Sequence, residues 1–171
     1  GERWPTSPGA RWRIFLLGNT NVWDMTDLHF GLRNSPFKYY LNDDSREHDV
    51  YTTEPGNDDS LGFVESSPKL TLTNLLTEVD LEPTDILYVD TGIYPVSPTN
   101  LLFWSKSDGG APGQPIQCIG STDSNGSWIV SDAPPLKGQV EIEAPYVNMQ
   151  NLNFSSESLA FTGGGTVASN L

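Results

Sequence analysis

The hydrophobic residues of the second half of the chain fall into short runs separated by turn-forming residues. Eight such runs follow Asp85, and Gly, Pro, Asn, Asp and Ser fill the intervals between them. Runs of three or four residues bounded in this way are typical of β-strands. The predicted strands span residues 86–89, 101–104, 116–119, 128–130, 140–142, 147–149, 152–154 and 159–161. We therefore predict an all-β region from Asp85 onward.

One segment has the period of an amphipathic helix instead. Its apolar residues recur at i, i+3, i+4 and i+7, as Leu72, Leu75, Leu76 and Val79. Thr71 is suited to cap the N-terminus, and prolines at positions 68 and 83 bound the segment on both sides. The pattern predicts a helix over about residues 71–80, whose leucine face must dock on an apolar surface.

The chain before the helix divides into two parts. Residues 1–37 contain four of the five arginines and one predicted strand at 11–17, and we expect this segment to be an arm, linker or docking strand. Residues 38–84 form a lead-in region, with predicted edge strands at 38–42 and 49–53 and the predicted helix. Residues 85–171 hold the short strands described above.

An internal comparison bears on how these strands are arranged. Shifting the chain by 24 positions places Trp104 on Trp128, Asp108 on Asp132, and Ile116 on Val140. Periods of 20 to 50 residues are typical of stacked repeats, so this offset favours a solenoid. In such a coil, the residue pairs 147/149 and 152/154 point inward, with the bend at Gln150 and Asn151. A sandwich of antiparallel strands remains the alternative.

Six segments share a pattern of short apolar strands and turns: GNDD at 56–59, PKLTL at 68–72, DILYVDTGIY at 85–94, GQPIQCIG at 113–120, VEI at 140–142 and YVNMQNLNF at 146–154. In these segments the chain resembles secreted proteins with a right-handed parallel β-helix, the pectate-lyase-like fold. The resemblance covers residues 38–162. It implies an all-β solenoid in which the leucine helix caps the N-terminal end of the stack. The strand pattern of residues 160–171 has no closing helix, so we expect an incomplete stack that continues beyond residue 171 or is covered by another chain.

Charge limits the range of partners. The 171 residues include 9 Lys and Arg against 22 Asp and Glu, a net charge of −13. A surface this acidic disfavours nucleic acids, and it repels anionic polysaccharides unless a divalent cation such as Ca²⁺ bridges the two. The longest strongly apolar run, at 14–17, is too short for a membrane span. The lone cysteine, Cys118, lies between isoleucines and is expected to be buried and inert.

No catalytic residue is assigned. The resemblance implies lyases that bind Ca²⁺ with surface carboxylates and abstract a proton with Arg or Lys. No Arg follows Arg46, and Lys106 and Lys137 both lie in turn-rich stretches. A hard-oxygen calcium site is one interpretation of Asn57, Asp58 and Asp59, joined by the carboxylates at positions 43 and 44. The other is that these are turn residues bonded to their own backbone.

Two tryptophans are candidates for glycan binding. If the 24-residue offset holds, Trp104 and Trp128 lie in register on adjacent coils and form an aromatic platform for sugar rings. The alternative is that both pack in the core, since each adjoins a hydrophobic run. His29 and His48 have no partner at metal-ligand spacing, so neither indicates a zinc site.

These observations predict a non-catalytic structural or adhesive module of an extracellular or cell-surface protein. Its expected partners are a polysaccharide, or another copy or chain at the open end of the stack. The alternative is the N-terminal part of a polysaccharide lyase or epimerase whose catalytic coils lie outside this chain. The fold alone does not separate the two.

Overall fold

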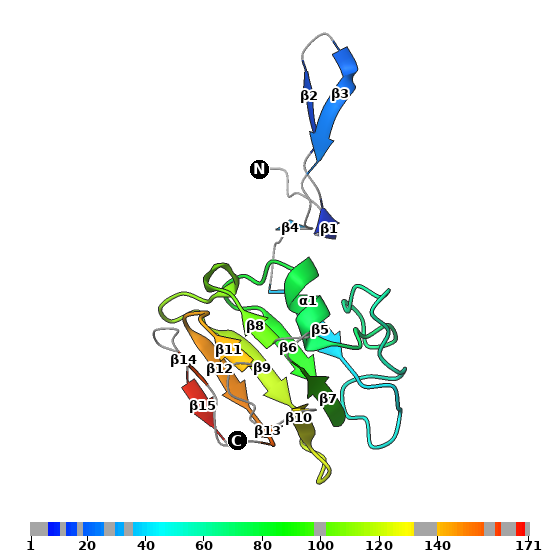
Figure 1. Ribbon diagram of the computed structural model, residues 1–171, viewed down its shortest axis with the longest axis vertical. Helices are drawn as coiled ribbons and strands as arrows, with labels where there is room; N and C mark the ends of the chain where they lie inside the picture. Colours follow the sequence, from blue (N-terminus) through cyan, green and yellow to red (C-terminus); the bar gives the residue numbers. More distant parts are fainter. Residues whose placement is uncertain are drawn as a thin grey trace.

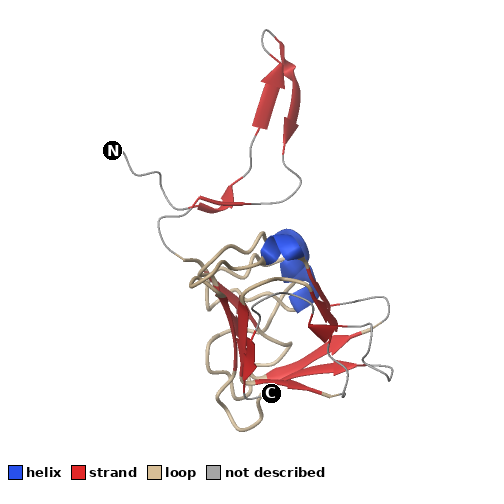
Figure 2. Ribbon diagram, turned by 90° about the vertical axis from the view of Figure 1, so that its left-hand side faces the viewer, coloured by secondary structure: helices blue, strands red, loops and turns tan. Residues whose placement is uncertain are grey.

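The computed structural model describes residues 7–10, 13–16, 19–25, 30–32, 36–97, 102–131, 140–155, 160–161 and 167–169. Strands dominate these ranges, and most of them lie in parallel sheets (Figures 1 and 2). Among the described residues, the helical elements are α1 (Leu72–Glu78) and a short 3₁₀ turn, η1 (Lys106–Asp108). No helix in the described part of the chain is long and apolar enough to cross a membrane. The fold is therefore β-rich with little helix.

The strands fall into an N-terminal antiparallel group and a larger parallel group. The antiparallel strands are β1 (Ser7–Ala10), β2 (Arg13–Leu16), β3 (Asn19–Met25) and β4 (Phe30–Leu32), paired β1 with β4 and β2 with β3. The parallel strands are β5 (Lys38–Leu41), β6 (Ile86–Val89), β7 (Gly92–Val96), β8 (Leu102–Trp104), β9 (Ile116–Gly120), β10 (Ser127–Ser131), β11 (Val140–Ile142), β12 (Val147–Gln150), β13 (Leu152–Phe154), β14 (Ala160–Phe161) and β15 (Val167–Ser169).

The parallel strands form three separate sheets. Their strand orders are β15-β12-β9-β6-β5, β13-β10-β7 and β14-β11-β8. From β6 onward, neighbours within a sheet are three strands apart in chain order, so the chain visits each sheet in turn before returning to the first. Figure 1 shows β6, β9 and β12 side by side, with α1 at one end of the group.

The predicted 24-residue offset is wrong. Trp104 on β8 pairs with Ile142, 38 positions later, whereas Trp128 on β10 pairs with Asn153, 25 positions later. Cys118 and Met149 pair at a third spacing, 31 positions. The reason is that loops of unequal length join the strands, while backbone hydrogen bonds and the inward-facing residues fix the register. The tryptophans therefore belong to different sheets.

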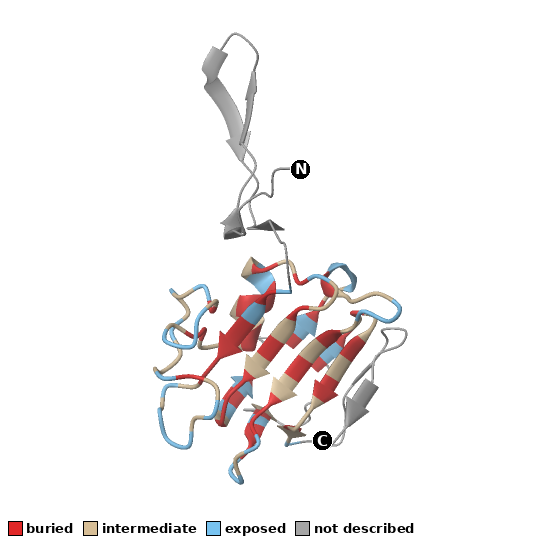
Figure 3. Ribbon diagram, turned by 180° about the vertical axis from the view of Figure 1, so that it is seen from behind, coloured by how far each residue is buried: buried red, intermediate tan, exposed pale blue. Residues whose placement is uncertain are grey.

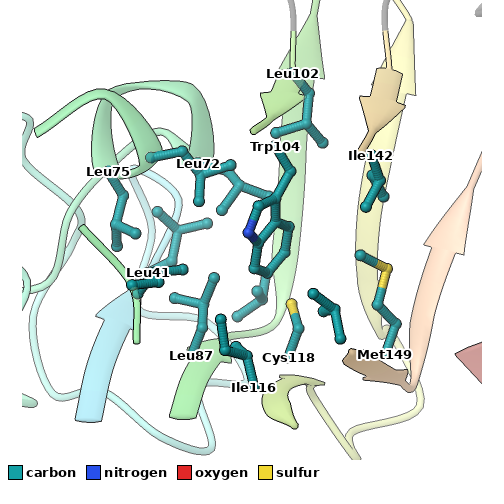
Figure 4. Close-up of a cluster of buried hydrophobic side chains, with 14 of the residues drawn as sticks. Leu41, Leu72, Leu75, Leu87, Leu102, Trp104, Ile116, Cys118, Ile142 and Met149 are labelled. Atoms are coloured by element: carbon teal, nitrogen blue, oxygen red, sulfur yellow. The ribbon is translucent and has the colours of Figure 1, made fainter. Parts of the chain in front are cut away.

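The core lies between the sheets and α1. Inward residues alternate with outward ones along most strands (Figure 3), as the two-residue period of a β-strand requires. Leucines from α1 and β6 and the side chains of Trp104, Cys118 and Met149 point into one cluster (Figure 4). Cys118 is fully buried, which confirms its predicted burial, and burial raises the pKa of its thiol to about 12.

The predicted helix is confirmed with slightly shorter bounds. Thr71 caps it, because its Oγ1 accepts a hydrogen bond from Asn74 N at 3.3 Å. Leu72, Leu75 and Leu76 are buried in the core cluster, and the helix contacts β8. The helix therefore depends on docking its leucine face, as its modest intrinsic propensity requires.

Residues 49–53 do not form the predicted strand. The backbone amides of Val50, Tyr51 and Thr52 instead donate to the carboxylate of Asp90, at 2.7, 2.8 and 2.7 Å. Thr52 Oγ1 and Thr91 N donate to the same carboxylate, each at 2.8 Å. Asp90 itself is fully buried. Residues 50–52 are therefore held by a side chain rather than by a neighbouring strand.

The prediction missed β7. Gly92 and Pro95 interrupt its apolar pattern, and the segment is not among the predicted strands. β7 lies at the edge of its sheet. An edge strand tolerates Pro95, which has no backbone N–H, whereas a central strand would need that donor for a hydrogen bond to its neighbour. Tyr94 and Val96 are buried while Ile93 is exposed, which is the alternation of a half-buried strand.

Replacing Asp90 tests how far the fold depends on its carboxylate. Asp90→Ala leaves several buried backbone donors without an acceptor, so we expect a loss of about 3 kcal/mol or more in the free energy of unfolding. Asp90→Asn keeps one acceptor oxygen and is expected to lose less. Urea unfolding measures both variants. The exposed residue Asp44 is the control, and Asp44→Asn should change stability by less than about 0.5 kcal/mol. An Asp90→Ala variant as stable as this control would contradict the assignment.

Candidate functional site

The outer face of the β13-β10-β7 sheet carries a row of three side chains. Trp128 on β10 pairs with Ile93 on β7 and with Asn153 on β13. Ile93 is 61% exposed and Trp128 is 41% exposed, while Asn153 is half-buried. Paired residues of neighbouring strands lie about 4.8 Å apart. The row therefore forms a continuous strip with an aromatic ring at its centre.

A tight turn holds the ring of Trp128. Its Nε1 donates to Asn125 O at 2.7 Å. The turn is fixed in its own right, because Asp123 Oδ1 accepts from both Asn125 N and Asn125 Nδ2 at 2.8 Å. Gly126 has a φ of +67°, a backbone conformation that favours glycine, and a Cβ there would displace the Asn153 amide, which lies 2.6 Å away. The indole is thus positioned by the fold before any ligand arrives.

Two open depressions lie on either side of Trp128 and share it as a wall. One, of about 450 Å³, is lined by residues 121–126, Trp128, Asn151 and Asn153. The other, of about 440 Å³, is lined by Asp43, Ser45, Glu47, His48, residues 91–93, Asn125, Gly126 and Trp128. Both volumes fall in the range of small-ligand sites. We call the row and its two depressions the Trp128 surface.

The charged groups around the Trp128 surface are mainly acidic. The carboxylate of Asp43 is committed to the backbone, since Oδ1 accepts from Ser45 N at 2.8 Å and Oδ2 from Ile93 N at 3.2 Å. Glu47 is exposed. His48 Nδ1 lies 3.9 Å from Asp123 Oδ2, which links the walls of the two depressions. No Lys or Arg among the described residues lines either depression.

Trp104 does not belong to this surface. It is fully buried on β8, and its Nε1 donates to Asp108 O at 2.9 Å. The predicted platform of Trp104 and Trp128 is therefore wrong, because the two residues lie in different sheets and face opposite environments. Trp104 is a core residue, and only Trp128 of this pair is accessible to a ligand.

Asn57, Asp58 and Asp59 are engaged as turn and cap residues. Asn57 Oδ1 accepts from Asp59 N at 2.9 Å, and the Asp58 carboxylate accepts from Thr71 N at 2.9 Å and from Thr71 Oγ1. The buried Lys69 donates from Nζ to Asp58 O at 2.7 Å. Within the described residues, no group of three or more His, Cys, Asp or Glu is placed to hold a metal ion. The turn interpretation accounts for all of these contacts.

Asp49 lies beside the buried carboxylate of Asp90. Its Oδ2 accepts from Asn42 Nδ2 at 2.8 Å, whereas Oδ1 is buried and has no hydrogen-bond partner. Burial raises the pKa of Asp49, the negative charges of Asp90 and Asp43 add to the rise, and the hydrogen bond from Asn42 opposes it. The charged form of Asp49 is thus disfavoured by folding.

Comparison with known proteins finds no matching family model, no similar curated protein and no similar solved structure.

Sequence reasoning found part of the Trp128 surface and missed the rest. It identified Trp128 as a candidate for an exposed aromatic ring, and the predicted inward pair 152/154 implied that Asn153 faces outward. It missed Ile93, because β7 was not predicted, and it missed the wall formed by Glu47 and His48. The alternation of Ile93, Tyr94, Pro95 and Val96 was the available signal for β7. Nothing in the sequence of 42–48 indicated which strand it would lie against.

The raised pKa of Asp49 gives a prediction about pH. A carboxyl whose folded pKa lies above its unfolded value of 3.8 binds more protons when folded, so its contribution to stability falls as pH rises through the folded pKa. Asp49→Asn keeps an acceptor for Asn42 and removes the charge. We therefore expect the variant to gain stability relative to the natural chain as pH rises from about 4 to 7. Thermal unfolding over this pH range measures the difference, and a gap that stays constant with pH would refute the explanation.

Proposed function

We propose that residues 85–171 form the first coils of a right-handed parallel β-helix and that residues 38–84 form its entry region, in which α1 covers the N-terminal end. The support is the parallel pairing of strands three apart in chain order, which recurs in each of the three sheets. Crossover connections between parallel strands are right-handed in nearly all proteins, and this determines the proposed hand. The fully buried face of α1 next to β8 is what a capping helix requires.

We propose that this β-helix is a non-catalytic structural or adhesive module of an extracellular or cell-surface protein. The observation that carries this proposal is that no Lys or Arg among the described residues lines the Trp128 surface, while three of the described cations form ion pairs elsewhere. Arg46 pairs with Glu54, Lys69 is buried against Glu78 at 2.6 Å, and Lys106 lies 3.5 Å from Glu143. Elimination from a uronate needs a basic side chain within reach of the substrate proton, near groups that neutralise the carboxylate. These ion pairs offer no such group at the Trp128 surface.

The strand register is tested by engineered disulfides. Gln117 and Asn148 are paired, outward-facing residues on β9 and β12, so their Cα atoms are about 4.8 Å apart. This separation lies within the roughly 4.4 to 6.8 Å that a disulfide spans. We expect Gln117→Cys with Asn148→Cys to form a disulfide on mild oxidation, as detected by mass spectrometry.

The matched control moves one partner by two positions along β12. Gln117→Cys with Gln150→Cys places the Cα atoms about 8 Å apart, beyond the reach of a disulfide. Cys118 stays in both variants, because its buried thiol is unreactive. Cross-linking of the control pair in preference to the paired positions would contradict the parallel arrangement.

The non-catalytic role is tested by a uronate-cleavage assay. The intact protein is incubated with polygalacturonate and with alginate, each with and without Ca²⁺, and unsaturated uronate products are measured by their absorbance. We expect no product above the buffer control. Product formation above the buffer control would overturn the non-catalytic proposal in favour of a lyase, and its loss in Lys106→Ala would identify Lys106 as the base.

A further inference from the structure

We propose that the Trp128 surface binds an uncharged saccharide chain that lies across strands β7, β10 and β13. This proposal builds on the adhesive role proposed above, and it names the chemical class of the ligand and the residues that hold it. It rests on the row of Ile93, Trp128 and Asn153, on the two depressions that flank it, and on the charges around it.

The ring of Trp128 is suited to stack against a sugar. Its one hydrogen-bond donor, Nε1, is occupied by Asn125 O, so what the exposed part of the ring offers a ligand is its apolar π surface. A pyranose ring has an apolar face of C–H groups that matches such a surface, with hydroxyls at its rim. Ile93 extends the apolar strip on one side of the indole, and Asn153 supplies an amide on the other. One sugar ring therefore finds an apolar surface to stack on and an amide to hydrogen-bond with.

The dimensions favour a chain over a single sugar. Three neighbouring strands cover two interstrand spacings, which is roughly 10 Å along the row. The two depressions continue the surface on both sides of Trp128. Their polar walls, including Asp123 and Asn151 on one side and Ser45 and Glu47 on the other, place hydrogen-bonding groups where the hydroxyls of flanking sugars would lie. A short oligosaccharide is the ligand that fills this length.

Charge excludes the acidic glycans. Carboxylates of Asp43, Glu47 and Asp123 surround the ring, and His48 is the basic side chain that the described walls provide. A uronate or a sulfated sugar would be repelled here, and the repulsion would be strongest at low ionic strength. Because Asp43 and Asp123 already accept hydrogen bonds from their own loops, these carboxylates do not need a cationic ligand to be satisfied. An uncharged saccharide is therefore the best match.

A protein partner fits this surface less well. Stable protein interfaces bury about 800 Å² on each partner around an apolar centre. Here the apolar centre consists of Ile93 and Trp128, and open polar depressions lie on both sides of it. This apolar centre is too small for a protein interface, whereas one exposed aromatic ring beside hydrogen-bonding groups matches the size of a sugar.

The experiment screens the intact protein on immobilised oligosaccharides and then measures affinity by titration calorimetry. The panel contains uncharged hexamers of glucose, mannose, xylose and galactose, with hexagalacturonate and a glucosamine hexamer as charged probes. We expect binding to at least one uncharged hexamer, and weaker binding to hexagalacturonate. Trp128→Ala should weaken the affinity at least about tenfold, and Trp128→Phe should retain part of it.

Phe103 supplies the matched control. It is 47% exposed on β8, an aromatic residue on the outer face of a different sheet. Phe103→Ala should leave the affinity unchanged. Thermal unfolding establishes that each variant is folded, and Asn153→Ala provides a second, milder change at the site, with an expected loss of several-fold.

Three results would overturn the proposal. They are the absence of binding to every uncharged hexamer, binding to either charged probe that equals or exceeds binding to the uncharged ones, and an equal loss of affinity in Phe103→Ala and Trp128→Ala. The binding measurements and the uronate-cleavage assay test the two proposals separately. Uronate cleavage would refute that role and leave the binding of an uncharged hexamer at Trp128 in place, whereas failure to bind would refute only the saccharide site.

Discussion

The buried carboxylate of Asp90 is the interaction on which the outer loops of this protein depend. Five hydrogen bonds converge on its two oxygens, three of them from consecutive backbone amides of residues 50–52. Without this acceptor, the buried amide of Thr52 and the partly buried amides of Val50 and Tyr51 would lose their hydrogen-bond partner, which is costly for a fold. The Asp90 carboxylate thus accepts the hydrogen bonds that a neighbouring strand would otherwise accept.

A polar network around Asp90 extends this anchoring to the Trp128 surface. Ser127 Oγ donates toward Val89 O and Asp90 O, both at 2.8 Å, so the residue next to Trp128 is tied to the same turn. Thr91 Oγ1 donates to His48 O at 2.8 Å and lies 2.6 Å from Ser121 Oγ. The loops that form the walls of both depressions are therefore connected through one buried network. Such networks are rigid when every member is satisfied, and rigidity is what a preformed binding surface needs.

Local patterns predicted the regular elements because those patterns are set by backbone geometry. The strands at 86–89, 140–142 and 152–154 and the leucine helix follow from alternation and from helical spacing within the segment itself. The left-handed bend at Asn151, with a φ of +55°, follows from the tolerance of Asn for that conformation. Each of these features depends on a few consecutive residues.

Features that depend on distant residues were not predictable in the same way. The segment at 49–53 has the composition of a strand, but its amides bond to a carboxylate about 40 positions later. The false repeat arose similarly: identical tryptophans at 104 and 128 suggested equivalent positions, whereas loop lengths between them place one on β8 and the other on β10. Pairing partners are a property of the assembled sheets, and residue identity at a fixed offset does not determine them.

The contrast between the two tryptophans shows what decides whether an aromatic residue becomes core or surface. On β8, Leu102 and Trp104 share the inward face and Phe103 points out. On β10, Ser127 and Ile129 are the inward pair, so Trp128 is outward although it is more apolar than Ser127. Bringing Trp128 inward would require a one-residue slip that also exposes Ile129 and breaks the contacts of Ser127 with Val89 and Asp90. The polar network therefore fixes the register, and the register in turn keeps an indole ring at the surface.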